Sequence, residues 1–188
     1  MTASTLRNAI VKFAAALTIG NATPTGLATY ELGTTTPRVM LAALTLSAAG
    51  LVGLVSYEGY TDRAVIPVKG DVPTIGFGTT SGVKPGDRIT PPVALARAMR
   101  DVTKFEGAVK ECVTVPLHQH ELDAYVSLAY NIGPTAFCNS TLVKKLNTND
   151  YAGACAEISK WNRQGGRVLQ GLVNRRAAER AMCDGEIR

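Results

Sequence analysis

Metal-binding residues are scarce in this sequence. It has only two histidines, His118 and His120, and none of its four cysteines is spaced as Cys-x-x-Cys. Structural zinc sites need such ligands at short, regular spacings, so we expect no zinc site. No other motif implies a cofactor.

Aromatic residues and clustered charge are also lacking. Aromatic side chains make up 6% of the chain, and its 20 lysines and arginines are scattered along it. Nucleic-acid-binding proteins usually gather basic residues on one patch or helix, so we expect no nucleic-acid partner. The net charge of +5 suits an anionic polymer or surface instead.

Charged residues are absent from one long stretch at residues 39–57, VMLAALTLSAAGLVGLVSY. It is just long enough to cross a hydrocarbon layer of ~30 Å. Basic residues outnumber acidic ones before it, so the positive-inside rule places the N-terminus in the cytoplasm and the remainder outside. Its many Ala, Gly, Ser and Thr residues make a weak anchor. We expect an N-terminal segment (1–37), a membrane-spanning segment (38–57) and a soluble domain (58–188).

A second apolar stretch, FAAALTIG at residues 13–20, is too short to span a membrane. It could be the core of a cleavable signal peptide with a cleavage site near residues 26–28. The following residues, up to 38, are rich in Thr, Gly and Pro, which is typical of a linker. Whether the N-terminal segment is ever removed stays open.

Two short strands and then several helices are expected after Glu58. Residues 65–66 and 72–77 are rich in Val and Ile and flank a turn at 69–71. Helix-start residues and apolar residues at helical spacing follow. They are Thr90 and Pro91 before Leu95, Met99, Val102, Phe105 and Val109; Leu122, Tyr125, Val126 and Ala129 before Gly133; Ser140; Asp150 before Ala154, Cys155, Ile158 and Trp161; and residues 172–183. This order predicts an α+β fold that is mainly helical.

The cysteines, Cys112, Cys138, Cys155 and Cys183, all lie in the expected soluble domain. An even number beyond a membrane-crossing segment indicates disulfides in an oxidising compartment, and the alternative is four buried thiols in the cytosol. Four cysteines allow three pairings. Joining those on neighbouring helices gives Cys112–Cys138 and Cys155–Cys183, each contributing about 3 kcal/mol by the loop-entropy model.

Glu58 begins a stretch, EGYTDRAVIPVKGDVPTIGFGTT, that combines carboxylates and hydroxyls near a turn. Glycoside hydrolysis needs one carboxylic acid to protonate the leaving oxygen and a second group to activate or position water. Glu58 suits the first role, and Asp71 with Thr74 suits the second. Spacing alone does not decide this, because carboxylates beside a turn are usually just solvated.

Several motifs then follow one another along the chain: EG at 58–59, TIGFG at 74–78, AYNIGPTAF at 129–137, STLVKKLN at 140–147, DYAGAC at 150–155, WNRQGG at 161–166 and GLVNRRAAER at 171–180. Together they resemble the phage-type lysozymes, the family-24 glycoside hydrolases found among phage endolysins. The resemblance implies a small β-containing lobe, a helical lobe and a cleft between them. It also implies cleavage of peptidoglycan at the MurNAc–GlcNAc β-1,4 bond, with Glu58 as the catalytic acid.

The water side of the site departs from the family's pattern. The family has Asp nine residues after its catalytic Glu, but that position here is Pro67, and Thr74 stands one residue farther from Glu58 than usual. Asp71 is the nearest stand-in. Asp62 is a second candidate if the helix continues past Glu58, and a site without a catalytic Asp is a third. The third keeps a lytic transglycosylase open, an enzyme that cuts the same glycan without water.

The resemblance also implies residues around the acid. Tyr130 and Asn131 match positions that line the cleft, although a core aromatic and a helix-end Asn fit equally well. Arg175 and Arg176 stand where the family often has an arginine near the catalytic Glu, and the alternative is a basic face on a surface helix. A nearby cation favours an ionised carboxylate, whereas burial favours the protonated acid.

Residues just before Glu58 would have to form both the membrane span and the first helix of the domain. This N-terminus resembles signal-anchor-release endolysins, which implies a tethered, inactive state in the host inner membrane and an active state released to the periplasm. The expected partners are peptidoglycan glycan strands and the inner membrane, contacted through residues 39–57, and the expected state is a monomer. A non-enzymatic membrane- or wall-binding protein is the remaining alternative.

Overall fold

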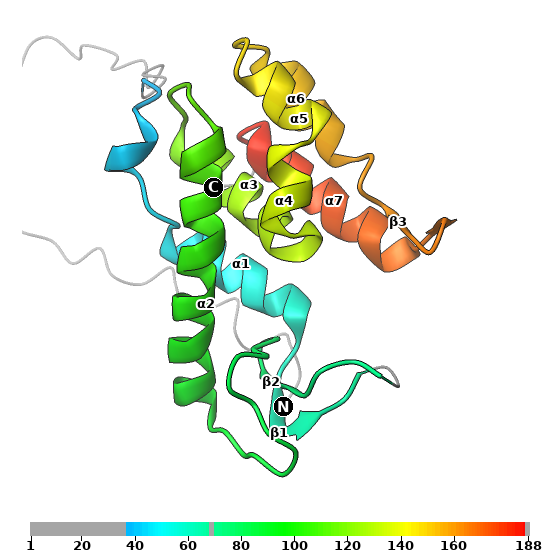
Figure 1. Cartoon of the computed structure of the whole chain (residues 1–188). Helices are drawn as coiled ribbons and strands as arrows, with labels where there is room; N and C mark the ends of the chain where they lie inside the picture. Colours follow the sequence, from blue (N-terminus) through cyan, green and yellow to red (C-terminus); the bar gives the residue numbers. More distant parts are fainter. Residues whose placement is uncertain (1–36, 68–69, 187–188) are drawn as a thin grey trace, which may run out of the picture. The chain divides into compact units, whose positions relative to one another are not determined.

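Helices make up most of this computed structural model, which describes residues 37–67 and 70–186 (Figure 1). The signal-peptide alternative at residues 13–20 lies outside the described residues. In chain order the helices are the 3₁₀ helix η1 (Leu41–Ala43), α1 (Ala48–Glu58), α2 (Pro91–Cys112), α3 (Gln119–Ile132), α4 (Pro134–Cys138), α5 (Thr141–Leu146), α6 (Tyr151–Ile158) and α7 (Gln170–Cys183). Two antiparallel pairs accompany them, β1 (Thr61–Val65) with β2 (Thr74–Gly76), and β3 (Arg163–Gln164) with β4 (Arg167–Val168). The mainly helical prediction is confirmed.

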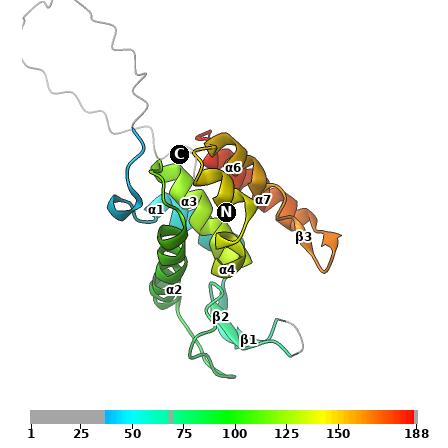
Figure 2. The ribbon, with the colours of Figure 1, turned by 45° about the horizontal axis from the view of Figure 1, so that its top comes forward.

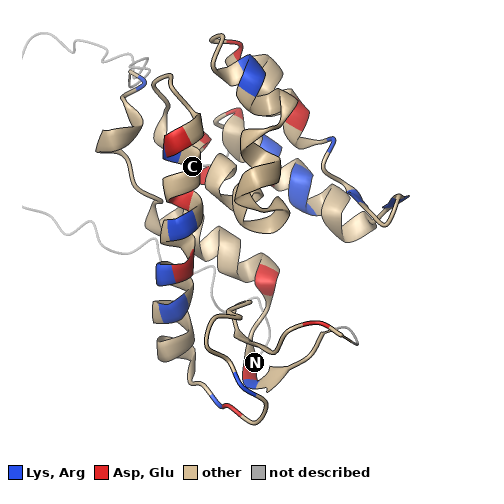
Figure 3. Ribbon diagram, viewed as in Figure 1, with Lys and Arg blue, Asp and Glu red and all other residues tan. Residues whose placement is uncertain are grey.

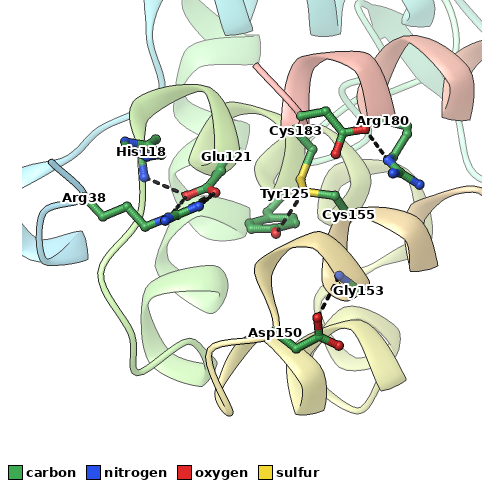
Figure 4. The surroundings of a disulfide bond; sticks show 10 residues. Arg38, His118, Glu121, Tyr125, Asp150, Gly153, Cys155, Arg180 and Cys183 are labelled. Atoms are coloured by element: carbon green, nitrogen blue, oxygen red, sulfur yellow. Dashed lines mark hydrogen bonds and ion pairs between the residues drawn. A yellow bond between two sulfur atoms is a disulfide. The ribbon is translucent and has the colours of Figure 1, made fainter. Parts of the chain in front are cut away.

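The helical region has α3 at its centre, packed against α1, α2, α4 and α7. Because other elements pack around α3, its own apolar residues are buried on every side of the helix. They include Leu122, Ala124, Tyr125, Val126, Leu128 and Ala129. Two disulfides fasten the neighbouring helices. Cys112–Cys138 joins α2 to α4. Cys155–Cys183, shown in Figure 4, joins α6 to α7. These are the two pairs expected from the order of the helices.

The β region, residues 59–90, has a separate and much smaller core. Ile75, Val83 and Ile89 form it together with Ala94 of α2. In both views the β1–β2 sheet lies at the N-terminal end of α2, away from α5 and α6 (Figures 1 and 2). Because α2 also contributes Val102 and Val109 to the helical core, it is the long element that joins the two regions.

The strands of the β region differ from the expected ones. β1 starts at Thr61, before the expected residues 65–66, and β2 covers only Thr74–Gly76 of the expected 72–77. Backbone pairing on both edges of β1 explains this: β2 lies on one side, and on the other the Ala64 N–H donates to Asp87 and the Ile89 N–H donates to Asp62. Hydrogen-bonding partners, rather than Val and Ile content, set the position of β1.

The prediction of which residues form the apolar face of α2 is wrong for the first half of the helix. Leu95 is 38% exposed and Met99 is 55% exposed, whereas Ala94 and Ala98 are buried. The reason is a close approach to the β region, since a Cβ on Gly76 would lie only 2.9 Å from the Cβ of Ala94. Only small side chains fit at that distance, so the large ones face outward.

The uncharged stretch at residues 39–57 is not one helix in this structure. Backbone after η1 is extended until Ser47, which begins α1 by accepting the Gly50 N–H at 2.9 Å. Leu41, Leu44 and Leu54 are buried in the helical core. Among the residues that the structure describes, no helix combines the length and apolar character needed to cross a membrane.

Carboxylates of α3 hold this stretch in place. Asp123 accepts the backbone N–H of Ser47 at 2.9 Å and its hydroxyl at 2.5 Å, and Glu121 pairs with Arg38 at 2.7 Å (Figure 4). A Cβ on Gly50 would lie 2.8 Å from Cγ of Asp123. Residues 38–50 therefore join the domain through specific polar contacts as well as through apolar burial.

Candidate functional site

Glu58 is the last residue of α1, at the border of the helical and β regions. Gly59 follows with a φ of 68°, a left-handed conformation that ends the helix and that glycine adopts without strain. The Glu58 side chain is 20% exposed, and its Oε1 lies 2.8 Å from Nη1 of Arg175. The guanidinium of Arg175 also stands over the ring of Tyr57, 5.1 Å from the centroid. Glu58 is thus partly accessible and held by a cation.

Helix α7 contributes a group of buried charged side chains next to Glu58. Arg175 Nε lies 3.1 Å from Glu179 Oε1, and Arg176 Nε lies 2.7 Å from Glu179 Oε2. The hydroxyl of Ser127 on α3 donates to Glu179 Oε1 at 2.7 Å. Burial lowers the pKa of Arg176. Both arginines are buried, so they do not form a basic surface face.

Tyr130 and Asn131 are neighbours on α3 that contact different residues. The Tyr130 hydroxyl donates to the carbonyl oxygen of Phe77 at 3.1 Å, while Asn131 Oδ1 accepts from Arg176 Nη1 at 3.0 Å. Burial, followed by the negative charge of Glu58, raises the pKa of Tyr130 to about 12. Tyr130 is therefore neutral near neutral pH and links the helical region to the turn after β2.

Gly78 in that turn leaves space beside the acid. A Cβ at this position would lie 3.5 Å from Glu58 Oε2 and 3.6 Å from the Tyr130 hydroxyl. Its φ of 88° also disfavours other residues. The next residue, Thr79, is buried and donates to Asp101 of α2 at 2.6 Å, which fixes the turn. The Gly-x-Gly motif pointed to this turn, but Thr79, Asp101 and Glu179 were not identified from the sequence.

Asp71 and Thr74 both make their hydrogen bonds with a near neighbour, Val72. Asp71 is exposed, and its Oδ1 accepts the backbone N–H of Val72 at 2.9 Å. Thr74 begins β2 and donates to the Val72 carbonyl at 3.2 Å. The structure therefore brings Glu58, Tyr130 and Arg175 together, while the contacts of the two water-side candidates remain local.

Asp62 lies on β1 and not on a continuation of α1, because the helix ends at Glu58. Its side chain is exposed and lies 3.7 Å from Arg63 Nε. The condition under which Asp62 was a candidate is not met.

Charges elsewhere in the described chain are spread over several elements (Figure 3). Within residues 37–67 and 70–186, no three His, Cys, Asp or Glu side chains are grouped as a metal site. His118 and His120 stack with ring centroids 5.1 Å apart at the start of α3.

Known proteins are similar to this chain in sequence and in fold. The family model described as phage lysozyme matches residues 55–179. An endolysin of Acyrthosiphon pisum secondary endosymbiont phage 1 is 41% identical over 143 residues, 74% of this chain and 97% of that protein. A SAR-endolysin of Pseudomonas phage phiKMV is 39% identical, covering 72% of this chain and 86% of that protein. The solved endolysin from Escherichia coli O157:H7 phage FAHEc1 has a TM-score of 0.70 and 35% identity, covering 77% of this chain and 96% of that one.

Proposed function

Because the chain belongs to the phage lysozyme family, and is thus a phage endolysin with muramidase activity, we propose that Glu58 is its general acid. One observation carries this assignment: Glu58 is a partly exposed carboxylate at a helix end, held at 2.8 Å by the buried Arg175. The reaction is hydrolysis of the MurNAc–GlcNAc β-1,4 bond of peptidoglycan.

The two oxygens of Glu58 have different surroundings, which supports a division of roles. Oε1 contacts Arg175, whereas Oε2 faces the space beside Gly78. A proton on Oε2 can pass to a glycosidic oxygen placed in that space, as general acid catalysis requires. Tyr130, fixed on the Phe77 carbonyl, borders the same space and is proposed to contact the sugar. Asn131 is proposed to act indirectly, by accepting a hydrogen bond from Arg176.

Thr74 and Asp71 are proposed for the water side of the reaction. Asp71 lies in the loop before β2 and Thr74 begins β2, which leads into the Gly-x-Gly turn, so a small movement of this segment would reorient both side chains. Asp71→Asn and Thr74→Ala should each lower kcat about 10²-fold or more if these groups activate or hold the water.

The decisive experiment digests purified peptidoglycan with the full chain and its Glu58→Gln variant. Glutamine cannot donate the proton at neutral pH, so we expect activity to fall by at least about 10²-fold with thermal unfolding unchanged. Mass spectrometry should find reducing MurNAc ends in the wild-type digest. A folded Glu58→Gln enzyme with near-normal activity would remove Glu58 from the mechanism.

A lytic transglycosylase is the second candidate, favoured by Pro67 in place of the usual Asp and by the exposed position of Asp71. Such an enzyme needs the acid but no water-activating carboxylate. It would leave 1,6-anhydro ends and tolerate both Asp71→Asn and Thr74→Ala. The same digests therefore separate the two reactions.

We also propose that residues 38–57 first anchor the chain in the host inner membrane, with the N-terminus in the cytoplasm, and are then released to the periplasm. The uncharged sequence of this segment supports the tethered state, and the name SAR-endolysin of a relative points the same way. Leu54 cannot be in lipid and in the helical core at once. Until release, residues 58–188 would therefore lack part of their core. Glu58 would also lack the packed helix that supports it.

Leucine substitutions at exposed positions of this segment test the release. Ala48, Ala49 and Ser56 are exposed in the folded domain, so changing all three to Leu strengthens membrane insertion without filling the core. We expect this variant to remain in the inner membrane and to delay lysis, yet to cut peptidoglycan after detergent extraction.

Gly50→Leu is the matched control, because its side chain would collide with Asp123. It should be inactive even after extraction. Lysis on the normal schedule by the triple variant would show that release is not the controlling step.

A further inference from the structure

Glu179 is the most deeply buried carboxylate near Glu58, and the proposed reaction does not use it. Its side chain is 1% exposed and lies between two guanidinium groups of its own helix. Oε1 receives hydrogen bonds from Arg175 Nε, from Arg176 Nη2 and from the hydroxyl of Ser127. A carboxylate with this many donors is expected to be fixed in one orientation.

The contacts form a row of alternating charges that ends at the acid. Glu58 contacts Arg175, Arg175 contacts Glu179, and Glu179 contacts Arg176. When Glu58 is ionised, two positive and two negative charges therefore balance in this row. Without the charge of Glu179, two buried guanidinium groups would act on Glu58 alone, which would favour its ionised form.

Arg175 also depends on Glu179 for its direction. Its Nε points to Glu179 while its Nη1 points to Glu58, and its Nη2 lies 3.4 Å from the Ser127 carbonyl. Because a guanidinium is planar, fixing the Nε side determines where Nη1 lies.

We propose that Glu179 is a positioning residue for the muramidase reaction: it orients Arg175 toward Glu58 and offsets the charge of both arginines beside the proposed acid. This inference rests on the proposed role of Glu58 as general acid.

Other ionisable groups near Glu58 come from three further helices and stay unchanged in the test. They are Tyr57 on α1, Asp101 on α2 and Tyr130 on α3. Asp101 is engaged by Thr79, and Tyr130 donates to Phe77.

The test is the pH dependence of kcat/KM for the full chain carrying Glu179→Gln, a change that keeps the size of the side chain. The alkaline limb of the profile reports loss of the proton from the acid. We expect this limb to move to lower pH by about one unit, because removing the negative charge beside the two arginines favours the ionised form of the acid. A purely structural role would lower activity equally at every pH and leave the limb in place, which would overturn the proposal.

The double variant Glu179→Gln/Arg176→Met restores the charge balance, so its limb should return toward the wild-type position. If Glu179→Gln does not fold, Arg176→Met alone tests the opposite sign, and its limb should move to higher pH. An unmoved limb in that variant would also overturn the proposal.

Glu157→Gln is the matched control. Glu157 is a buried carboxylate of α6 that lies 2.7 Å from Lys145 and 2.8 Å from Lys160, without contact to Glu58. Its substitution should lower stability and leave the limb unchanged. Glu58→Gln separates the two claims: if that variant stays active, the proposed acid is wrong, whereas an inactive Glu58→Gln with an unmoved limb in Glu179→Gln rejects only the role of Glu179.

Discussion

The helical region and the β region differ in how much of each is buried. The helical core includes most of α3 and parts of every other α-helix, and both disulfides fasten it. The β region has four buried apolar residues, one of them borrowed from α2, and its sequence contains no cysteine. A two-stranded sheet with so small a core is not stable by itself. The site lies at this border, with Glu58 and Arg175 on the stable side and Gly78 on the weaker side.

The largest difference should come from truncating one core residue in each region. Phe137 is fully buried in the helical core, and Phe137→Ala should lower the free energy of unfolding by about 3–5 kcal/mol. Ile75 is 1% exposed in the β region, and Ile75→Ala should instead promote local opening of that region. Calorimetry and hydrogen exchange check both.

Calorimetry should show a much lower Tm for Phe137→Ala and a small change for Ile75→Ala. Hydrogen exchange in Ile75→Ala should accelerate at residues 59–90 and not in α3. Equal loss of Tm in the two variants would mean that both regions unfold as one unit.

Removing a disulfide should act on the helical region alone. Cys155 and Cys183 are separated by 28 residues, so changing both to Ser should cost about 3 kcal/mol by the loop-entropy model. Urea unfolding measures the loss. Hydrogen-exchange rates in the β region serve as the internal control. Faster exchange there would contradict the separate stabilities of the two regions.

Alkaline pH should distinguish a tyrosine of the helical core from one at the border. Burial raises the pKa of both Tyr125 and Tyr130, and that of Tyr130 reaches about 12. An unfolded tyrosine loses its proton near pH ~10, so the unfolded state is favoured as pH rises from ~10 upward. The contribution of Tyr130 to the free energy of unfolding is fully present below that pH. It is lost as the pH rises toward the pKa of Tyr130 in the folded protein.

Urea unfolding from pH 9 to 11.5 measures this loss. Tyr130→Phe should reduce the pH dependence, and Tyr125→Phe should reduce it more because Tyr125 is more deeply buried. An unchanged slope in both variants would show that other groups control alkaline unfolding.

The smallest effect is expected on the exposed face of α2. Met99 is 55% exposed, so Met99→Ala should change the free energy of unfolding by less than about 0.5 kcal/mol. Ala98, its buried neighbour, is the control, because a larger residue there should cost about 1–3 kcal/mol. Urea unfolding compares the two.

Features of the fold with local signals were predictable, and those set by packing were not. Ser140 and Asp150 cap α5 and α6 as expected, because a side-chain oxygen that accepts an N–H three residues later is a short-range interaction. Trp161 was expected on α6, but that helix ends at Ile158. The β3–β4 hairpin was missed, although Gly165–Gly166, both with positive φ, is the two-residue turn that such hairpins prefer.

Residues of the candidate site were predictable when a sequence motif identifies a single position. Glu58 and Arg175 were both singled out, and the structure places them in contact. Glu179 could not be found in this way, because a glutamate four residues after an arginine on a helix is ordinarily a surface pair. Only burial of the whole face shows that its charge acts inside the protein.

The contact between Ser47 and Asp123 bears on how this protein should be produced in the laboratory. A recombinant fragment that starts at Glu58 would leave out Leu41, Leu44 and Leu54 and would leave Asp123 without Ser47. The shortest fragment that retains the described contacts starts at Arg38, which pairs with Glu121. Crystallisation and labelling studies of the active enzyme should therefore begin from residue 38 or earlier.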